Sequence, residues 1–297
     1  MREIRLPGGR GELAALRFGN PDGPKVLALH GWLDNAASFV PLAASLGAFD
    51  MVALDLPGHG ASAHRAAGYD YVYVDWLHDV LDALDALGWK RAHLLGHSMG
   101  ATLASTLAAA APERVAKLAL VEGLGPLGGP AESAATRLRE AVAARRALDA
   151  RRSDATRVIK DIDTALAARL QATPMREADA RLIVERNLQA VPGGWSWRSD
   201  PRLRLPSATR LPEAAIRAIL QAIDAPTLLI AAEPSPPYFP PTLRAERLAC
   251  LRDAHLHLFD GGHHVHMERA PEIGALLRDF LGDQGAVSAA GADSSMP

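Results

Sequence analysis

Short apolar runs alternate with segments of helical periodicity over the first part of the chain. Continuous apolar runs predict strands that are buried on both faces of a sheet, and apolar residues at helical spacing predict the helices between them. The predicted strands cover residues 25–29, 51–54, 92–95 and 117–121. Such alternation implies right-handed crossovers and therefore a parallel sheet. An antiparallel hairpin at the sheet edge is expected from residues 4–6 and 12–18.

The alternation stops between residues 124 and 225, where the chain becomes rich in Ala and Arg and keeps a helical period. One stripe at i, i+4 spacing consists of Val158, Ile162, Leu166 and Leu170. Connections of this length are uncommon in compact domains and often act at binding sites. We therefore expect residues 124–225 to form a helical lid over the strand ends. The alternative is a scaffold subdomain that does not contact substrate.

The sheet is expected to resume after this insertion, with strands at residues 227–231 and 255–259 and a closing helix at residues 271–281. The core domain then consists of residues 1–123 and 226–282. Residues 283–297 contain Gly, Ala and Ser without periodicity, which predicts a disordered tail.

Composition narrows the class of protein. The 297 residues are 48% hydrophobic and 22% charged, which is typical of a globular protein with a sizeable core. The formal net charge of −2 gives no general attraction to nucleic acid or to an acidic membrane surface. No apolar run approaches the ~18 residues of a membrane span, and residues 1–11 lack the apolar segment of a signal peptide. We expect a cytoplasmic monomer or homodimer that acts on a small molecule.

A candidate nucleophile lies in Gly96-His97-Ser98-Met99-Gly100, between a predicted strand and a predicted helix of small residues. A serine at a sharp strand-to-helix turn has a strained backbone, and side chains at the two glycine positions would collide there. The turn presents the Ser98 hydroxyl outside the sheet. It also places the backbone N–H of Met99 at a helix start, where a developing negative charge is stabilised.

Further motifs follow the same order as in a known superfamily. They are His30-Gly31-Trp32, Asp55-x-Pro57-Gly58-His59-Gly60-x-Ser62, Gly96-x-Ser98-x-Gly100 and Gly262-His263. Together they resemble the α/β-hydrolase fold superfamily across almost the whole chain, and residues 30–39 and 261–264 are similar to its serine-hydrolase-like branch. The resemblance implies an α/β fold with a mostly parallel eight-stranded sheet, flanking helices and an inserted helical cap.

A serine hydroxyl needs a base, and the base needs an orienting acceptor. We expect His263 to be the base, because it follows the last predicted strand at the same sheet end as Ser98. His264 and His266 are rival candidates. A metal site is disfavoured because no second cluster with ligand spacing is present in the sequence. We expect no metal and no cofactor.

The acid of the triad has two candidates. The superfamily usually carries an aspartate a few residues after the strand 227–231, but Ser235 stands at that position. Some relatives carry the acid at the end of the preceding strand, which here gives Glu122. A glutamate that ends a buried strand needs a partner for its charge. Glu122 is therefore favoured, Glu233 is the alternative acid, and a lost acid is the third possibility.

The resemblance assigns the second oxyanion donor to the backbone N–H of Trp32, with Gly31 allowing a close approach. Trp32 and His97 are expected to line the substrate pocket. His30 is interpreted as a structural histidine, and Asp55 as a carboxylate that bonds local backbone.

A serine nucleophile argues against dehalogenase and epoxide hydrolase chemistry, which need a carboxylate in this fold. It favours cleavage of a small or medium apolar carboxylic ester through an acyl-enzyme, with no cofactor. Two alternatives stay open. One is hydrolysis of carbon–carbon bonds in diketone-like substrates, and the other is a non-catalytic ligand-binding protein that keeps the fold.

Overall fold

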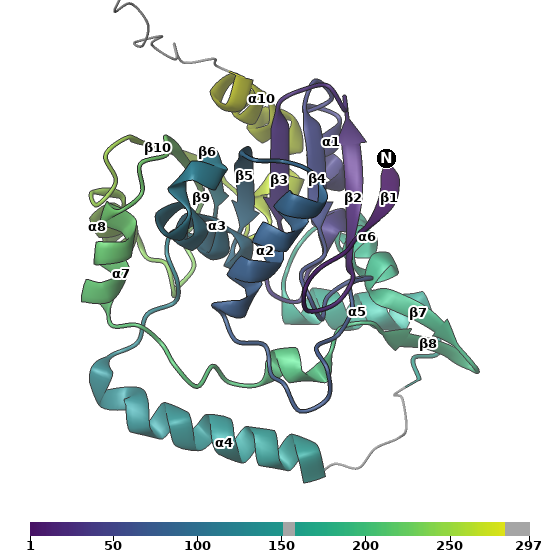
Figure 1. Cartoon of the computed structure of the whole chain (residues 1–297). Coiled ribbons are helices and arrows are strands. Elements are labelled where there is room, and N and C mark those ends of the chain that lie inside the picture. The colour runs from purple at the N-terminus through teal and green to yellow at the C-terminus, as the bar shows by residue number, and fades with distance from the viewer. Residues whose placement is uncertain (151–157, 283–297) are drawn as a thin grey trace, which may run out of the picture.

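The computed structural model describes residues 1–150 and 158–282. Its central sheet has the strand order β1-β2-β4-β3-β5-β6-β9-β10 (Figure 1). The strands are β1 (Arg2–Leu6), β2 (Leu13–Gly19), β3 (Lys25–Leu29), β4 (Asp50–Leu54), β5 (Ala92–His97), β6 (Val115–Val121), β9 (Thr227–Glu233) and β10 (Ala254–Asp260). β2 pairs antiparallel with β1 and β4, and the other neighbours are parallel. The predicted eight-stranded, mostly parallel sheet and its edge hairpin are confirmed.

The central strands are apolar throughout because both of their faces are covered. In β3, Leu27 and Leu29 belong to the hydrophobic cluster on one face, whereas Val26 and Ala28 belong to the cluster on the other. All four side chains are fully buried. The strands of the sheet from β2 to β9 therefore form the middle layer of a three-layer α/β arrangement, whereas the edge strand β10 is largely exposed.

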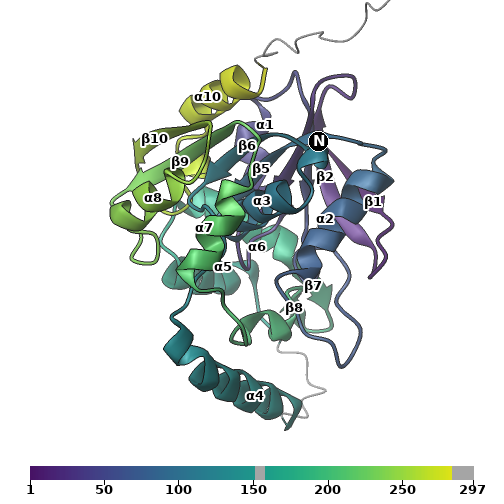
Figure 2. The same cartoon turned by 60° about the vertical axis from the view of Figure 1, so that its left-hand side comes forward.

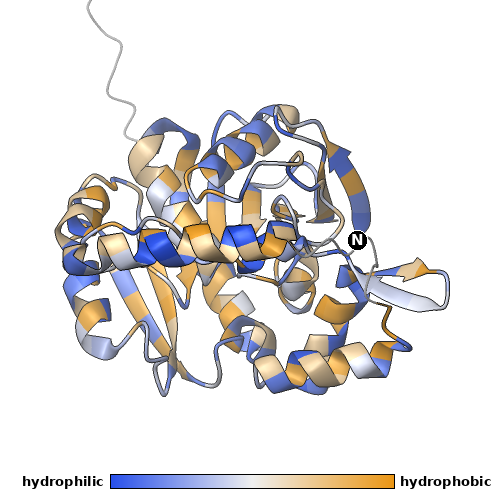
Figure 3. Ribbon diagram, turned by 90° about the horizontal axis from the view of Figure 1, so that it is seen from below, coloured by the Kyte–Doolittle hydropathy of each residue, from blue (hydrophilic) through white to orange (hydrophobic). Residues whose placement is uncertain are grey.

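Two layers of helices cover the sheet (Figure 2). Side chains of α2 (Asp75–Ala86), α3 (Met99–Ala110), α7 (Glu213–Gln221) and α8 (Pro241–Leu248) pack on one face. Those of α1 (Val40–Ala43), α9 (Val265–Glu268) and α10 (Ala270–Gly282) pack on the other. Short 3₁₀ helices lie at Ala36–Phe39, Pro112–Arg114, Ala131–Ser133 and Pro201–Arg204. Seen from below and coloured by hydropathy, the ribbons of the central strands are mostly hydrophobic (Figure 3).

The segment between β6 and β9 contains α4 (Ala134–Ala150), α5 (Ile162–Ala172), α6 (Glu177–Asn187), β7 (Leu188–Val191) and β8 (Gly194–Trp197). α5, α6 and the β7–β8 hairpin share a small hydrophobic cluster of their own, which includes Leu166, Val184 and Leu188. α4 lies at the outside of the molecule in two views, and none of its residues is buried (Figures 1 and 2). Its Arg145 pairs with Asp70.

Three details of the insertion differ from expectation. It is not helical throughout, because β7 and β8 turn at Gly193, which has a φ of 87°. Val158 lies outside α5 and is 49% exposed, so it does not extend the apolar stripe. Ile216 and Leu220 of α7 are fully buried in the core cluster, so this helix packs with the core although the expected boundary lies at residue 225.

The expected disordered tail, residues 283–297, lies outside the described residues.

Within the described ranges, 1–150 and 158–282, none of the helices combines the length and the apolar character that crossing a membrane requires.

Candidate active site

Ser98 lies at the sharp turn between β5 and α3, with φ 52° and ψ −116°. The glycines of the motif have the steric role expected of them. A Cβ on Gly96 would lie 2.5 Å from Ala101, and a Cβ on Gly100 would lie 1.9 Å from the carbonyl oxygen of Leu29. Only glycine at both positions lets α3 approach β3 this closely while Ser98 stays at the turn.

Backbone strain is concentrated at the ends of three neighbouring strands. Among the described residues, the non-glycine residues with positive φ are Leu33 (61°), Ser98 (52°) and Glu122 (58°). They follow β3, β5 and β6, which are adjacent in the sheet. Each such residue costs of order 1–3 kcal/mol, and strain of this kind clusters at functional sites. Sequence periodicity gives no signal for it.

Glu122 and His263 are brought together across the sheet. Glu122 Oε2 lies 3.3 Å from His263 Nδ1, and the glutamate side chain is fully buried. Its other oxygen, Oε1, accepts a hydrogen bond of 2.6 Å from the backbone N–H of Ala232. The Glu122 N–H in turn donates to Ile230 at 2.9 Å. β9 therefore holds the carboxylate in place beside the histidine.

Glu233, the alternative acid, has other partners. Its Oε1 accepts a hydrogen bond of 2.7 Å from Arg244 Nη2 and one of 3.2 Å from Ser235 Oγ. The hydrogen bond from Arg244 holds the pKa of Glu233 below its ordinary value. No hydrogen bond joins Glu233 to His263, although both residues are described. Of the two candidates, Glu122 is the carboxylate within reach of His263.

Tyr238 is a site residue that the sequence interpretation missed. Its hydroxyl lies 2.9 Å from His263 Nδ1 and 3.3 Å from Nε2. Burial raises the pKa of Tyr238 and so does the charge of Glu122, whereas a hydrogen bond with Ser98 acts to lower it. The crowding of prolines around Tyr238 was the one signal available in the sequence, since prolines restrict the backbone of a loop.

Trp32 and Met99, the oxyanion donors expected from the sequence, lie after β3 and after β5. Met99 is the first residue of α3, where backbone N–H groups have no partner within the helix. Trp32 lies in the turn after β3, and its side chain is 51% exposed. The indole Nε1 of Trp32 donates to the Leu203 carbonyl at 2.9 Å, which ties the turn to the inserted segment.

His97 differs from its expected place in the substrate pocket. Its ring is fully buried, with Nε2 2.9 Å from the His263 carbonyl and Nδ1 3.6 Å from Asp34 Oδ2. Burial lowers the pKa of His97 to about 3, so the ring is neutral at pH 7. The residue therefore supports the main chain of His263, and it has no surface to offer a substrate.

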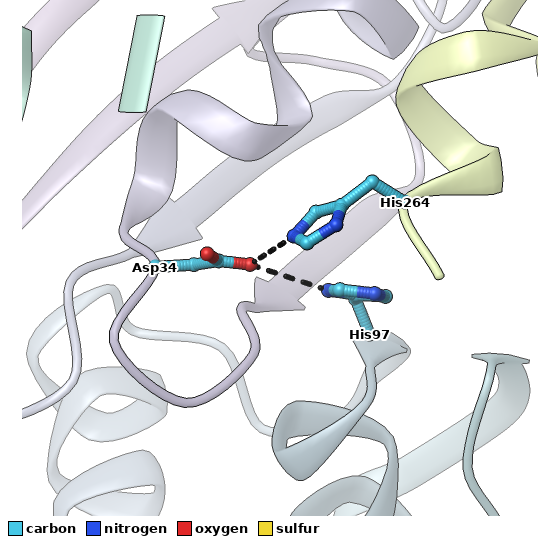
Figure 4. Close-up of side chains that lie close together, drawn as sticks. All are labelled: Asp34, His97 and His264. Carbon is cyan, nitrogen blue, oxygen red and sulfur yellow. Dashed lines mark hydrogen bonds and ion pairs between the residues drawn. The ribbon is translucent and has the colours of Figure 1, made fainter. Parts of the chain in front are cut away.

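His97 belongs to a buried polar cluster with Asp34 and His264 (Figure 4). His264 Nε2 lies 2.9 Å from Asp34 Oδ2, and Arg169 Nη2 from α5 donates to Asp34 Oδ1 at 2.5 Å. Burial acts to raise the pKa of Asp34, but its electrostatic interactions and hydrogen bonds with its neighbours, among them His264 and Arg169, outweigh this effect and hold the pKa well below its ordinary value.

The ligand atoms of Asp34, His97 and His264 lie within 4.8 Å of one another, which is close enough to hold a metal ion. The guanidinium of Arg169 already places a positive charge at this cluster. Its Nη2 bonds Asp34 and also lies 3.2 Å from His264 Nε2. A bound metal would have to displace this guanidinium. The cluster is thus better described as a charge-balanced support that joins the turn after β3, the end of β5, the turn after β10 and α5.

His30 and Asp55 form local bonds, as interpreted from the sequence. The Leu56 N–H donates to His30 Nε2 at 3.0 Å. Asp55 accepts hydrogen bonds from the N–H groups of Ala36 and Ala61, each at 2.8 Å. Asp55 also has a partner that is remote in sequence, because Arg186 of α6 pairs with its Oδ2 at 2.7 Å.

Known proteins share this fold and its motifs. A family model described as the alpha/beta hydrolase fold matches residues 24–270. A serine hydrolase-like protein of Danio rerio is 29% identical over 291 residues, covering 95% of this chain and 89% of the relative. The crystal structure of a hypothetical protein from Pseudomonas aeruginosa PAO1 is 42% identical with a TM-score of 0.86, covering 95% of this chain and 99% of that one.

A thioesterase domain from the curacin biosynthetic pathway is 27% identical with a TM-score of 0.81, covering 93% of this chain and 99% of that domain. The family match covers most of the chain and includes Ser98 and His263. The chain therefore belongs to the α/β-hydrolase fold family, and within it to the serine-hydrolase-like branch.

Proposed function

We propose that this hydrolase cleaves a small or medium apolar carboxylic ester through an acyl-enzyme, with Ser98, His263 and Glu122 as its triad. The observation that carries the proposal is the 3.3 Å contact between Glu122 and His263, at the same sheet end as the strained Ser98 turn. A buried carboxylate beside the base is what a nucleophilic serine needs for its activation.

In the proposed reaction, Ser98 Oγ attacks the ester carbonyl carbon while His263 takes the hydroxyl proton. The N–H groups of Trp32 and Met99 stabilise the oxyanion. His263 then gives its proton to the leaving alcohol, and the bond between the carbonyl carbon and the alcohol oxygen breaks. Glu122 keeps Nδ1 of His263 protonated and oriented, and stabilises the imidazolium that forms.

The inserted segment is proposed to act as the lid of this site. Two contacts support this role. Arg169 of α5 bonds Asp34 in the turn that carries Trp32, and Leu203 accepts the hydrogen bond of the Trp32 indole. The insertion is thus attached to the turn that carries a proposed oxyanion donor.

The thioesterase domain to which the chain is similar supports chemistry at an acyl group. Carbon–carbon bond hydrolysis would use the same triad, but no contact in the described residues favours it over ester cleavage. A comparison of apolar esters with diketone-like substrates separates these two activities.

The test is hydrolysis of p-nitrophenyl acetate and butyrate, together with labelling by a fluorophosphonate. We expect wild type to turn over and to be labelled, and Ser98→Ala to lose about 10⁴-fold or more of kcat. Ser207→Ala is the matched control, because Ser207 is exposed and bonds only the Thr209 carbonyl. A folded wild type that is neither active nor labelled would favour the ligand-binding protein instead.

A further inference from the structure

Tyr238 is held by a stiff segment of chain. The stretch from Pro234 to Pro241 contains five prolines, and proline fixes φ and lowers the flexibility of a loop. The next residue, Phe239, is 4% exposed within the core cluster, and its N–H donates to the Pro236 carbonyl at 3.0 Å. The backbone that carries Tyr238 is thus anchored, and the position of its ring follows from the fold.

The Tyr238 hydroxyl lies beside the proposed base. It is 2.9 Å from Nδ1 of His263 and 3.3 Å from Nε2. An interaction with Ser98 acts to lower its pKa. No hydrogen bond joins Ser98 directly to His263, although both residues are described. Tyr238 is 47% exposed, so solvent reaches this residue.

The protonation state of this hydroxyl is settled by its surroundings. Burial raises the pKa of Tyr238 above its already high ordinary value, and the nearby charge of Glu122 raises it further. The group therefore stays an O–H throughout the neutral range. It can donate one hydrogen bond and accept another, as an ordered water requires from its neighbours.

Deacylation needs a group that can donate a hydrogen bond to the attacking water or accept one from it. The hydrolytic water must lie within reach of His263 and of the acyl carbon on Ser98, and an ordered water needs two to four polar partners. His263 supplies one of them. The Tyr238 hydroxyl already lies within hydrogen-bond distance of the same imidazole.

We propose that Tyr238 is a further catalytic residue, whose hydroxyl positions the hydrolytic water during deacylation; this inference rests on the proposed function. The water oxygen bonds to the acyl carbon while His263 takes one of its protons. The bond between that carbon and Ser98 Oγ then breaks, Oγ receives the proton from His263, and the carboxylic acid leaves.

The two half-reactions should respond differently to loss of the hydroxyl. p-Nitrophenolate is a good leaving group that departs without a proton, so acylation by its esters does not need an oriented water. Deacylation does. Removal of the Tyr238 hydroxyl should therefore slow the second step and let the acyl-enzyme accumulate, which appears as a burst of p-nitrophenol.

The experiment compares wild type, Tyr238→Phe and Tyr69→Phe in rapid-mixing assays with p-nitrophenyl butyrate. For Tyr238→Phe we expect kcat to fall about tenfold, the factor for one lost hydrogen bond. KM should fall in parallel, kcat/KM should stay within about threefold of wild type, and the burst should approach one p-nitrophenol per site. Tyr69→Phe should behave as wild type, because Tyr69 is 69% exposed and no hydrogen bond joins its side chain to Ser98 or His263, all of which are described.

Thermal unfolding of each variant is compared with that of wild type, and an unchanged midpoint shows that the variant keeps the fold. Unchanged kcat and KM in Tyr238→Phe, or a kcat that rises, would overturn this inference while the proposed function stands. A fall of kcat/KM equal to that of kcat would also overturn it, because the hydroxyl would then act in acylation. A folded wild type without turnover or fluorophosphonate labelling would overturn the proposed function, and this inference with it.

Discussion

Oε2 of Glu122 lies 3.3 Å from Nδ1 of His263, although the two residues are 141 positions apart in the chain. The contact bridges β9, since Glu122 follows β6 and His263 follows β10. The positive φ of Glu122 and the Ala232 N–H together direct its carboxylate toward the histidine. This geometry distinguishes the acid of the proposed triad from the other glutamate that ends a strand.

Replacement of Glu122 by Gln should therefore lower kcat by about 10²–10⁴-fold, because the amide can no longer hold the imidazole in the required tautomer. Glu233→Gln is the matched control and should stay within a few fold of wild type, since its carboxylate pairs with Arg244. Steady-state hydrolysis of p-nitrophenyl butyrate measures both. The reverse order of effects would assign the acid to Glu233.

Asp34→Asn should lower the free energy of unfolding by about 3 kcal/mol, because it leaves the Arg169 charge without its partner in a mostly buried place. The side chains of Arg169 and Asp34 are 13% and 2% exposed. Asp224→Asn removes an exposed pair with Arg252 and should cost at most about 1 kcal/mol. Urea unfolding at pH 7 gives both values, and equal losses would contradict the supporting role of Asp34.

Stability should fall as the pH is lowered below about 6.5. Burial, together with the nearby charge of His30, lowers the pKa of His59 to about 3. Between these two pH values the unfolded chain binds a proton that the folded protein does not, so the free energy of unfolding decreases by about 1.4 kcal/mol per pH unit for this residue.

His59→Gln tests this dependence. The substitution should reduce the slope of the free energy of unfolding against pH, whatever it does to stability at pH 7. His255→Gln is the control, since that ring is 67% exposed. Urea unfolding between pH 4.5 and 7 supplies the slopes. If the slope of His59→Gln equals that of wild type, His59 is not held neutral by burial.

Gly100→Ala should destabilise the protein by about 3 kcal/mol or prevent its folding, because the new Cβ would lie 1.9 Å from the Leu29 carbonyl oxygen. Gly47→Ala is the control, since the nearest atom to a Cβ there lies 4.0 Å away. Thermal unfolding and soluble yield compare the two. A stable Gly100→Ala protein would mean that α3 can move away from β3.

The fold was predictable because its signals are local. Apolar runs such as residues 25–29 identify strands that are buried on both faces, and their alternation with helices identifies a parallel sheet. The β7–β8 hairpin was missed, since each of its strands has only four residues. The packing of α7 on the core was also missed, because periodicity shows which face is apolar but not what covers it.

The proposed site was predictable only in part. The strand-turn-helix around Ser98 is a local pattern, but both Glu122 and Glu233 end a strand, and no local feature decides which one faces His263. The Asp34–Arg169 pair spans 135 positions, so it depends on how the insertion returns to the core. Tyr238 lies in a loop without periodicity, where contacts follow from the tertiary fold alone.

Leu33, Ser98 and Glu122, the strained residues that follow β3, β5 and β6, lower the thermal stability of the fold at positions that the proposed catalysis requires. Glycine at Leu33, Ser98 or Glu122 would relieve of order 1–3 kcal/mol of backbone strain, yet at two of these positions it would delete a group of the proposed triad. The proposed catalytic role therefore retains a local weakness that the rest of the fold must offset. Substitutions that stabilise the protein without changing the proposed triad are then expected at exposed positions such as those of α4, none of whose residues is buried.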